Sequence, residues 1–192
     1  MENIVIKRTN KSDIEQIIKL ANAVWRVAYA HIMPQEIFDF NDANIGEKID
    51  RANKWQLNTN GNINLVAVAN NKIVAFASGD FGGSDNQSYV PELTGSDRIR
   101  NFIENKKLFW AEIVCVLPEY RNQGLQKILL KELIGKVKAK DIEYVVGTVS
   151  PDNIVSLNNL LNCDFHILDM VAYKINSKIY KRYLIYFPTK TN

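Results

Sequence analysis

The second half of the chain limits the fold most, because strand and helix patterns alternate there without interruption. Four segments carry the pattern, in the order strand, helix, strand and helix: 108–117, 122–139, 142–149 and 152–162. The second strand, IEYVVGTV, is largely apolar and reads as buried on both faces. Such alternation is typical of a sheet with helices packed on its faces.

Two hairpins extend this sheet. The first joins residues 63–69 to 72–79 through Asn70-Asn71, and the second is centred on Asn176-Ser177. A further strand at 3–8 opens the chain. The expected order is β-α-α-β-β-β-α-β-α-β-β, an α/β (mixed α+β) class with a central twisted mixed sheet of about seven strands flanked by helices.

Two helices precede the first hairpin. Ser12 and Glu15, three residues apart, fit a capping box for the first helix, whose apolar residues recur at three- and four-residue spacing. Pro34 suits the first turn of the second helix. That helix is expected to break near Gly46 and to end around Leu57.

Composition narrows the class of protein. The 192 residues, 46% of them hydrophobic, suit one compact domain. A net charge of +3 with both signs intermixed gives no nucleic-acid footprint, and no apolar run approaches the roughly 20 residues that span a bilayer. Cys115 and Cys163 lack metal spacing and read as buried thiols in a reducing compartment. We therefore expect a cytoplasmic protein without a metal, a membrane anchor or a nucleic-acid partner.

Residues 80–107 form a long polar connection rich in turn formers. The stretch RIRNFIEN inside it can supply a short helix. A connection of this length is usually functional or mobile, so a flap over a substrate and a surface insertion without function both stay open.

The turn PEYRNQGLQK, between the strand at 108–117 and the following helix, is the first candidate site. A helix that begins at Asn122 leaves its first N–H groups without intrahelical partners, and its dipole adds positive charge there. Arg121 and Lys127 bracket this point, and Gly124 has no side chain where an anion would approach the backbone. The glycine spacing of dinucleotide and nucleotide loops is absent. An ordinary strand-to-helix turn is the alternative.

The residues VLPEYRNQG resemble motif A of the GCN5-related N-acetyltransferase (GNAT) superfamily, in which a strand and a proline turn precede Arg/Gln-x-x-Gly-x-Gly/Ala at a helix start. Gln126 departs from this pattern, since the family usually has Gly or Ala there. The resemblance implies that backbone donors of the turn bind the pyrophosphate of acetyl-coenzyme A. The residues concerned are Arg121, Asn122, Gln123, Gly124, Leu125, Gln126 and Lys127.

A second segment, NIVSLNNLLNCDF, resembles motif B of the same family, Asn-x-x-Ala-x-x-Leu-Tyr-x-x-x-Gly-Phe, with Asn153 and Phe165 at its ends. Asn159, Leu160 and Asp164 depart from the family's Leu, Tyr and Gly. The resemblance covers nearly the whole chain and implies that Asn153 contributes to the cofactor site. It also implies one domain over 1–192. Within it, the acceptor side covers 1–60, a long loop 80–107, the acetyl-coenzyme A core 108–165 and the C-terminal hairpin 166–187.

The resemblance further implies direct attack of an amine on the thioester, with pantetheine bound to strand backbone at Val114, Cys115 and Val116. Cys115 then need not act as a nucleophile. Glu112 is the candidate base, because period-two alternation places it among apolar neighbours such as Trp110, which can raise its pKa. A solvated or salt-bridged glutamate is the alternative.

The general acid and the acceptor are less defined by the sequence. Leu160 stands where the family often has a proton-donating tyrosine, so Tyr173 in the last hairpin is the candidate acid, with packing or a water as alternatives. The stretch WRVAYAHIMP resembles bacterial small-amine and polyamine acetyltransferases, which implies that Trp25 and Tyr29 contact a cationic acceptor. Core packing of both aromatics is the alternative.

The expected activity is acetyl transfer from acetyl-coenzyme A to a primary amine of a small molecule such as a polyamine. Gln126, Leu160 and Asp164 favour one rival, a non-catalytic acyl-coenzyme A sensor or partner domain. A peptide or protein N-acetyltransferase is a second alternative, and a homodimer stays open.

Overall fold

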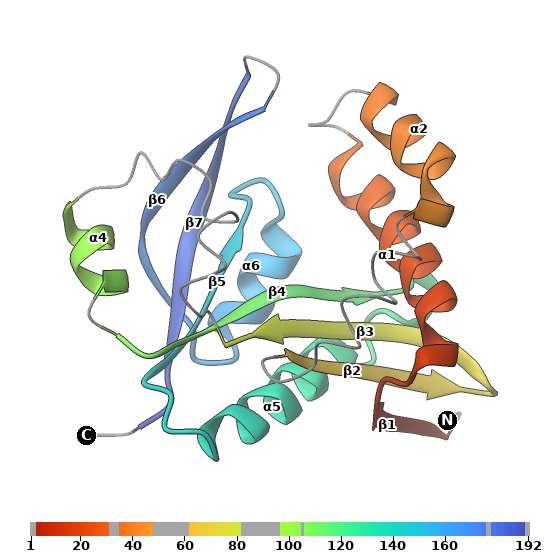
Figure 1. Ribbon diagram of the computed structural model, residues 1–192, viewed down its shortest axis with the longest axis horizontal. Coiled ribbons are helices and arrows are strands. Elements are labelled where there is room, and N and C mark those ends of the chain that lie inside the picture. Colours follow the sequence, from red (N-terminus) through yellow and green to blue (C-terminus); the bar gives the residue numbers. More distant parts are fainter. Residues whose placement is uncertain are drawn as a thin grey trace. The chain divides into compact units, whose positions relative to one another are not determined.

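A computed structural model describes residues 3–30, 35–47, 62–81, 97–104, 106–175 and 178–190 (Figure 1). The strands form one seven-stranded sheet in the order β1-β2-β3-β4-β5-β7-β6. They are β1 (Ile4–Arg8), β2 (Asn62–Ala69), β3 (Lys72–Asp80), β4 (Leu108–Val116), β5 (Tyr144–Val149), β6 (His166–Ile175) and β7 (Lys178–Pro188). The helices are α1 (Ile14–Tyr29), α2 (Gln35–Ala43), α4 (Asp97–Glu104), α5 (Leu125–Lys138) and α6 (Ile154–Leu161), with 3-10 turns η1 (Lys11–Asp13) and η3 (Pro118–Tyr120). The mixed class expected from the sequence is confirmed.

The sheet is largely antiparallel. β1 pairs with β2, β5 with β7 and β6 with β7 in antiparallel register, whereas β4 and β5 are parallel and are connected through α5. At one end of the β3–β4 pair the Leu117 N–H donates to the Val74 carbonyl at 2.9 Å. At the other end Gly79 lies against the Trp110 carbonyl, so β3 and β4 also run in opposite directions.

Both predicted hairpins are present. Asn70 and Asn71 have φ of 48° and 62°, the left-handed conformation that a two-residue type I′ turn requires. In the second hairpin Ile175 pairs with Lys178, and the two residues between them lie outside the described part of the chain.

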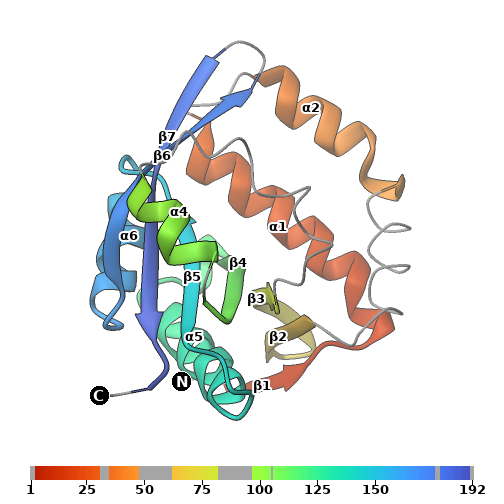
Figure 2. The ribbon, with the colours of Figure 1, turned by 60° about the vertical axis from the view of Figure 1, so that its left-hand side comes forward.

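The backbone contacts divide the chain into two compact units. The first comprises Met1–Ser78 and Ile113–Leu130, and the second comprises Gly79–Glu112 and Lys131–Asn192. Within the first unit, α1 crosses β2 and β3 at a steep angle (Figures 1 and 2). Its core joins α1 to β2, β3 and β4 through Ile17, Leu20, Val24, Val66, Ile73, Phe76 and Cys115.

The predicted capping box of Ser12 and Glu15 is wrong. Asp13 closes the N-terminal turn instead, because its Oδ2 accepts the Asn10 N–H at 2.9 Å. Glu15 is already inside α1, where its carboxylate pairs with Lys19 at 2.5 Å. The chain tightens into a 3-10 turn before α1 and moves the cap two residues toward the N-terminus.

The second predicted helix is interrupted near Gly46, as expected. α2 ends at Ala43, Asn44 forms a turn, and residues 45–47 are helical again, so the break precedes Gly46 by two residues. Pro34 and residues 48–57 lie outside the described part. Arg26 ties α1 to α2, since its guanidinium lies 3.6 Å from Asp39 and 5.3 Å from the Phe38 ring centre.

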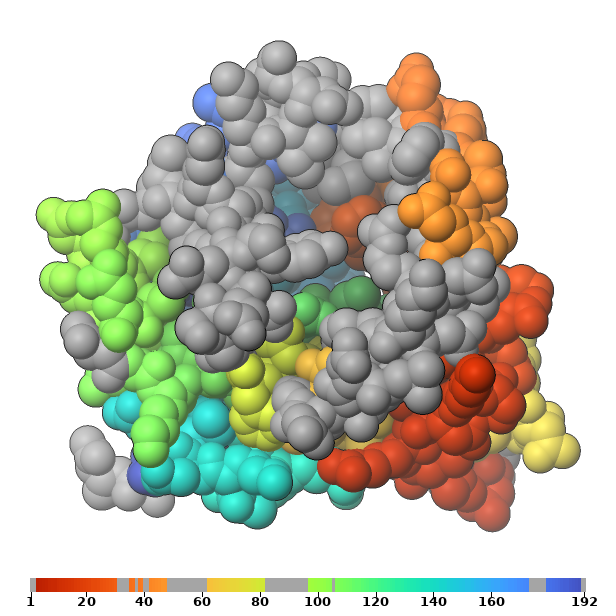
Figure 3. Space-filling model, viewed as in Figure 1, coloured from red at the N-terminus to blue at the C-terminus, as the bar shows by residue number. Residues whose placement is uncertain are grey.

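In the second unit, α4 and α6 cover opposite faces of the β5–β7–β6 part of the sheet (Figures 1 and 2). α4 is the short helix predicted within 80–107, of which residues 82–96 and 105 lie outside the described part. Its inner side meets the strands through Ile99, Phe102, Ile103, Leu168, Val171 and Leu184. α4 lies at the surface of the molecule (Figure 3), and its residues Arg98 and Arg100 are exposed. On the other face, Phe187 stacks near Phe165 at 5.6 Å.

Two expectations from composition concern residues that are described. Cys115 and Cys163 are both buried thiols, as predicted. Within the described ranges, no helix is long and apolar enough to cross a membrane.

Candidate functional site

The turn that follows β4 has the geometry of an anion-binding site. α5 begins at Leu125 rather than at the predicted Asn122, because the Ile128 N–H makes the first intrahelical bond, to the Gly124 carbonyl at 3.0 Å. Asn122 has a φ of 62°, which is incompatible with a helix start there. The N–H groups of residues 125–127 come before the first intrahelical bond, at the positive end of the helix dipole.

Gly124 leaves open space in front of this helix start. Its φ is +74°, a conformation that favours glycine, and a Cβ placed on it would meet no atom within 4 Å. The protein therefore does not fill the space that the missing side chain leaves. Arg121 and Lys127 are exposed on either side, and the Arg121 Nε donates to the Val116 carbonyl at 3.4 Å.

Contacts with the start of β3 hold the turn in place. The Lys72 Nζ lies 3.1 Å from Glu119 Oε1 and 6.0 Å from the centre of the Tyr120 ring. Both side chains are exposed, where an ion pair contributes little stability, so this pair orients η3 more than it stabilises the fold. The backbone bond from Leu117 to Val74 fixes the same end of β4.

β4 carries the three residues predicted to offer backbone groups to pantetheine. Its register with β5 covers Leu108–Trp110, and Val114, Cys115 and Val116 are its last three residues. Cys115 packs in the core of the first unit, and burial raises the pKa of its thiol to about 12. The thiol is therefore protonated at neutral pH and is unsuited to nucleophilic attack.

Glu112 combines exposure with a raised pKa. The structure describes every residue of β4, and Glu112 is the exposed one among them. The other residues of the strand are half-buried or buried. Partial removal of water around the carboxyl, together with the negative charge of Asp80, raises the pKa of Glu112 to about 7. A carboxyl that remains accessible and titrates near neutrality can accept a proton and release it again.

Asp80 was not among the residues predicted from the sequence, where it counted as the start of the long connection. It is the last residue of β3 and is 7% exposed, and burial raises its pKa as well. Both Asp80 and Glu112 belong to the second unit. The available signal was the pattern KIVAFASGD, in which a charged residue follows small residues at the end of an apolar strand.

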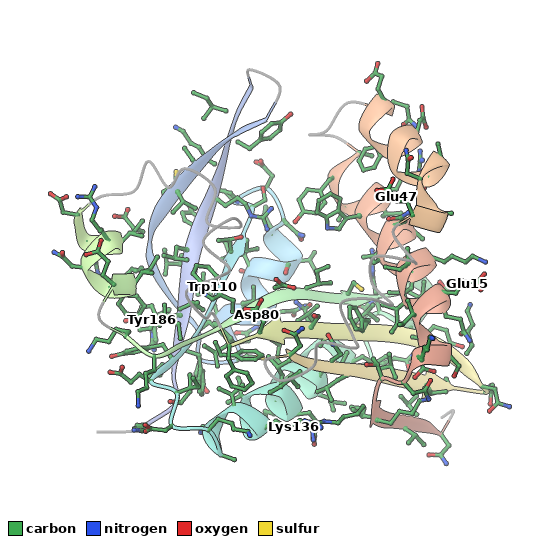
Figure 4. The ribbon with its side chains drawn as sticks, in the orientation of Figure 1. Glu15, Glu47, Asp80, Trp110, Lys136 and Tyr186 are labelled. Atoms are coloured by element: carbon green, nitrogen blue, oxygen red, sulfur yellow. The ribbon has the colours of Figure 1, made fainter. Side chains whose placement is uncertain are left out.

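Gly79 brings the end of β3 close to β4. A Cβ on Gly79 would lie 2.4 Å from the Trp110 carbonyl oxygen and 2.4 Å from Cε1 of Phe109, so only glycine fits. Figure 4 shows the next residue, Asp80, together with Trp110 from the neighbouring strand. Trp110 itself packs into the core of the second unit.

Asn153 has a structural role in addition to the predicted contact with the cofactor. It is the N-cap of α6, and its Oδ1 accepts the Ser156 N–H at 3.2 Å. A capping side chain of this type stabilises a helix by about 1 kcal/mol.

The end of α6 accounts for one departure from motif B. Asp164, at the glycine position, has a φ of 64°. Its N–H donates to the Leu161 carbonyl at 3.1 Å, and the Phe165 N–H donates to the Leu160 carbonyl at 3.2 Å, the two bonds of a Schellman motif. The aspartate thus keeps the backbone conformation that a glycine would adopt.

The structure describes some of the residues predicted as acid or acceptor contacts. Leu160 is buried and offers no proton, while Tyr173 lies in β6 opposite Tyr180, with its side chain outside the described part. Tyr29 is buried, and the Trp25 ring meets its edge at 5.4 Å. Trp25 is 38% exposed, so of these two aromatics it is the one that can contact a ligand.

A metal site has no support among the described residues, which contain no group of three or more His, Cys, Asp or Glu side chains placed to hold an ion.

The profile described as Acetyltransferase (GNAT) family matches residues 15–165. A comparison with curated proteins gives no sequence match.

Solved structures share the fold over nearly their whole length. The PaiA N-acetyltransferase of Thermoplasma acidophilum in complex with coenzyme A has a TM-score of 0.69 at 18% identity, covering 97% of this chain and 99% of that one. An N-acetyltransferase of Staphylococcus aureus Mu50 has a TM-score of 0.68 at 17% identity, covering 98% of this chain and 99% of that one. Arabidopsis thaliana NAA60 in complex with acetyl-CoA has a TM-score of 0.67 at 15% identity, covering 97% of this chain and 98% of that one. Identities this low indicate a common fold alone.

Proposed function

Because the chain belongs to the GNAT family of acetyltransferases, we propose that it transfers the acetyl group of acetyl-coenzyme A to a primary amine of a small molecule such as a polyamine. One observation carries the proposal, namely the exposed carboxyl of Glu112 with its pKa raised to about 7. An alkylamine with a pKa of about 10 is mostly protonated at neutral pH, so its attack needs such a base.

The turn after β4 fits the pyrophosphate of the co-substrate. The open space at Gly124 allows a phosphate to approach the backbone, and the N–H groups at the start of α5 supply donors. Arg121 and Lys127 add positive charge on the exposed side. In the proposal the whole stretch from Arg121 to Lys127 holds the pyrophosphate, Val114–Val116 offer backbone groups to the pantetheine arm, and Asn153 assists from α6.

The proposed reaction needs a base for the amine and a proton donor for the departing sulfur. Acetyl-coenzyme A, when bound, supplies an acetyl thioester whose carbonyl carbon an amine can attack directly. Glu112 takes a proton from the ammonium group of the acceptor, which frees the nitrogen lone pair for attack. As the new C–N bond forms and the C–S bond breaks, the nitrogen loses its second proton to water. The departing sulfur regains a proton from water or from Tyr173, because Leu160 has none to give.

Two features favour a cationic small molecule as the acceptor. The negative charge of Asp80 acts on Glu112 within the second unit, and two acidic groups there favour a positively charged substrate. The exposed ring of Trp25, in the first unit, offers a cation–π surface.

Thiol release from acetyl-coenzyme A tests the function. Diamines, polyamines, aminoglycosides and peptides with free N-termini form the panel, and Glu112→Gln is the matched variant. Turnover with small amines that falls in Glu112→Gln at unchanged coenzyme A affinity supports the proposal. Turnover with peptides alone assigns a peptide acceptor. Tight acetyl-coenzyme A binding without turnover across the panel refutes the proposed transfer and indicates a non-catalytic acyl-coenzyme A binder.

A further inference from the structure

We propose that the hydroxyl of Tyr183, in β7, is the proton donor to the sulfur of coenzyme A as the acetyl group leaves. This inference rests on the proposed function, because it supplies the acid that the acetyl transfer needs. It assigns that role to a residue other than Tyr173, in the same C-terminal hairpin.

The register of the sheet places Tyr183 at the carboxyl end of β5. Tyr183 pairs with Val149, the last residue of β5, and the turn that follows leads to Asn153 and α6. Paired residues of antiparallel strands have Cα atoms about 5 Å apart. In the proposed function Asn153 assists the co-substrate from this turn, so Tyr183 lies at the end of β5 where the thioester is expected.

The Tyr183 side chain lies on the face of the sheet that α6 covers (Figures 1 and 2). On that face Phe187, four residues later in β7, stacks near Phe165, and β7 pairs with β5 at every residue from Tyr183 to Phe187. Side chains alternate along a strand, so positions 183 and 187 point the same way. Leu160, the buried residue of α6, has no proton to give. A phenol on the neighbouring strand can supply it.

The other hydroxyl groups at this end of β5 are less suited to the role. Thr148 precedes the last residue of β5 and points to the opposite face, where its Oγ1 accepts the Arg182 Nε–H at 2.9 Å. Ser150 is 5% exposed. Tyr183 is half-buried, and none of the described residues forms a hydrogen bond with its hydroxyl. The phenol is thus the accessible proton donor at this position.

The backbone of Tyr173 lies farther from β5. Tyr173 pairs with Tyr180, which precedes Tyr183 by three residues, or about 10 Å along β7, and has no partner on β5. In addition, β7 separates β6, which carries Tyr173, from β5. The register therefore favours Tyr183 over both other tyrosines of the hairpin.

The proton transfer balances without a further reactant. As the C–S bond breaks, the sulfur keeps the electron pair and takes the proton of the Tyr183 hydroxyl, which gives the free thiol of coenzyme A. The tyrosinate then takes a proton from the water that accepted the second proton of the amine. Glu112 releases the first proton to solvent before the next turnover.

Tyr183→Phe tests the role, because it removes the hydroxyl and keeps the ring. Tyr173→Phe and Tyr180→Phe are the matched controls. General acids contribute about 10²–10⁴-fold, and a thiolate needs less help than most leaving groups. With an amine that the wild type acetylates, kcat should therefore fall at least about tenfold in Tyr183→Phe at unchanged KM, and both controls should keep the wild-type kcat. A wild-type kcat in Tyr183→Phe, or a fall in Tyr173→Phe alone, overturns the proposal.

Binding without turnover separates this inference from the proposed function. Calorimetry compares coenzyme A with desulfo-coenzyme A, which lacks the sulfur, in the wild type, Tyr183→Phe and Tyr173→Phe. If the hydroxyl donates to sulfur, the preference for coenzyme A should be about two- to tenfold greater in the wild type and Tyr173→Phe than in Tyr183→Phe. An equal preference in all three proteins overturns the proposal. If no amine is acetylated, the proposed function fails, while this comparison still decides whether Tyr183 contacts the sulfur.

Discussion

Gly79→Ala is expected to destabilise the protein strongly, because the new methyl group would overlap two atoms of β4. The Cβ would lie 2.4 Å from the Trp110 carbonyl oxygen and 2.4 Å from Phe109 Cε1, whereas ordinary contacts begin at 3.4 Å. About 1 Å of movement is therefore needed. The Phe109 side chain is fully buried and the oxygen belongs to strand backbone, so neither can move aside cheaply.

The magnitude follows from these contacts. Overpacking a well-filled core costs about 1–3 kcal/mol. The reduced entropy of the unfolded chain favours alanine by less than about 1 kcal/mol and offsets part of this. Because both contacts fall under 3.0 Å and neither atom can move aside cheaply, the cost is taken at the upper end of its range. A net loss of about 2–3 kcal/mol in the free energy of unfolding is then expected, measured by urea denaturation followed by circular dichroism.

Gly135→Ala is the matched control for this substitution. Gly135 lies inside α5, and a Cβ there meets nothing within 4 Å. Helix propensity alone should raise the free energy of unfolding by about 1 kcal/mol. Opposite signs for the two variants support the close approach of β3 to β4. Wild-type stability in Gly79→Ala would refute it.

Three further substitutions test separate parts of the structure. Gly124→Glu should abolish coenzyme A binding, measured by calorimetry, because the new side chain adds bulk and negative charge at the open helix start. The control Gly135→Glu, at an exposed position on α5, should leave binding unchanged. Undiminished affinity in Gly124→Glu would remove the pyrophosphate assignment. Asp164→Gly should raise the free energy of unfolding by about 1 kcal/mol, since it relieves a left-handed residue, and a loss of stability would contradict the Schellman motif. Asn153→Ala should lower it by about 1 kcal/mol through loss of the α6 cap, and an unchanged value would show that the cap contributes nothing.

The fold could be predicted where local chemistry determines the backbone. Asn70-Asn71 predicts a two-residue hairpin because asparagine tolerates positive φ, and both residues adopt it. The alternation from 108 to 162 predicts strands and helices correctly because each element is long enough for its period to be read.

Boundaries were less predictable where two local patterns compete. Ser12 with Glu15 satisfies the spacing of a capping box as well as Asn10 with Asp13 does, and only the 3-10 turn decides between them. Similarly, α5 begins at Leu125 because η3 and the positive φ of Asn122 precede it. The sequence of a proline turn does not show how many residues lie between the proline and the first residue of the helix.

The candidate site was predictable residue by residue but not as an arrangement. Glu112 stands out as an acid in an apolar strand, so its raised pKa could be expected from sequence. Asp80 did not stand out, since its burial depends on Gly79 and on a strand neighbour nearly 30 residues later. Sequence periodicity describes one strand at a time and does not give the charge that a neighbouring strand presents.

The central claim is that Glu112 is the base of an acetyl transfer, and the pH dependence of kcat/KM in the wild type and in Glu112→Gln tests it most directly. With the pKa of Glu112 raised to about 7, the wild-type rate should be low below that pH, where the carboxyl is protonated, and should rise through a midpoint near it. Glu112→Gln should bind coenzyme A normally, turn over about 10²–10⁴-fold more slowly and lack this midpoint. An identical profile in both proteins would contradict the account.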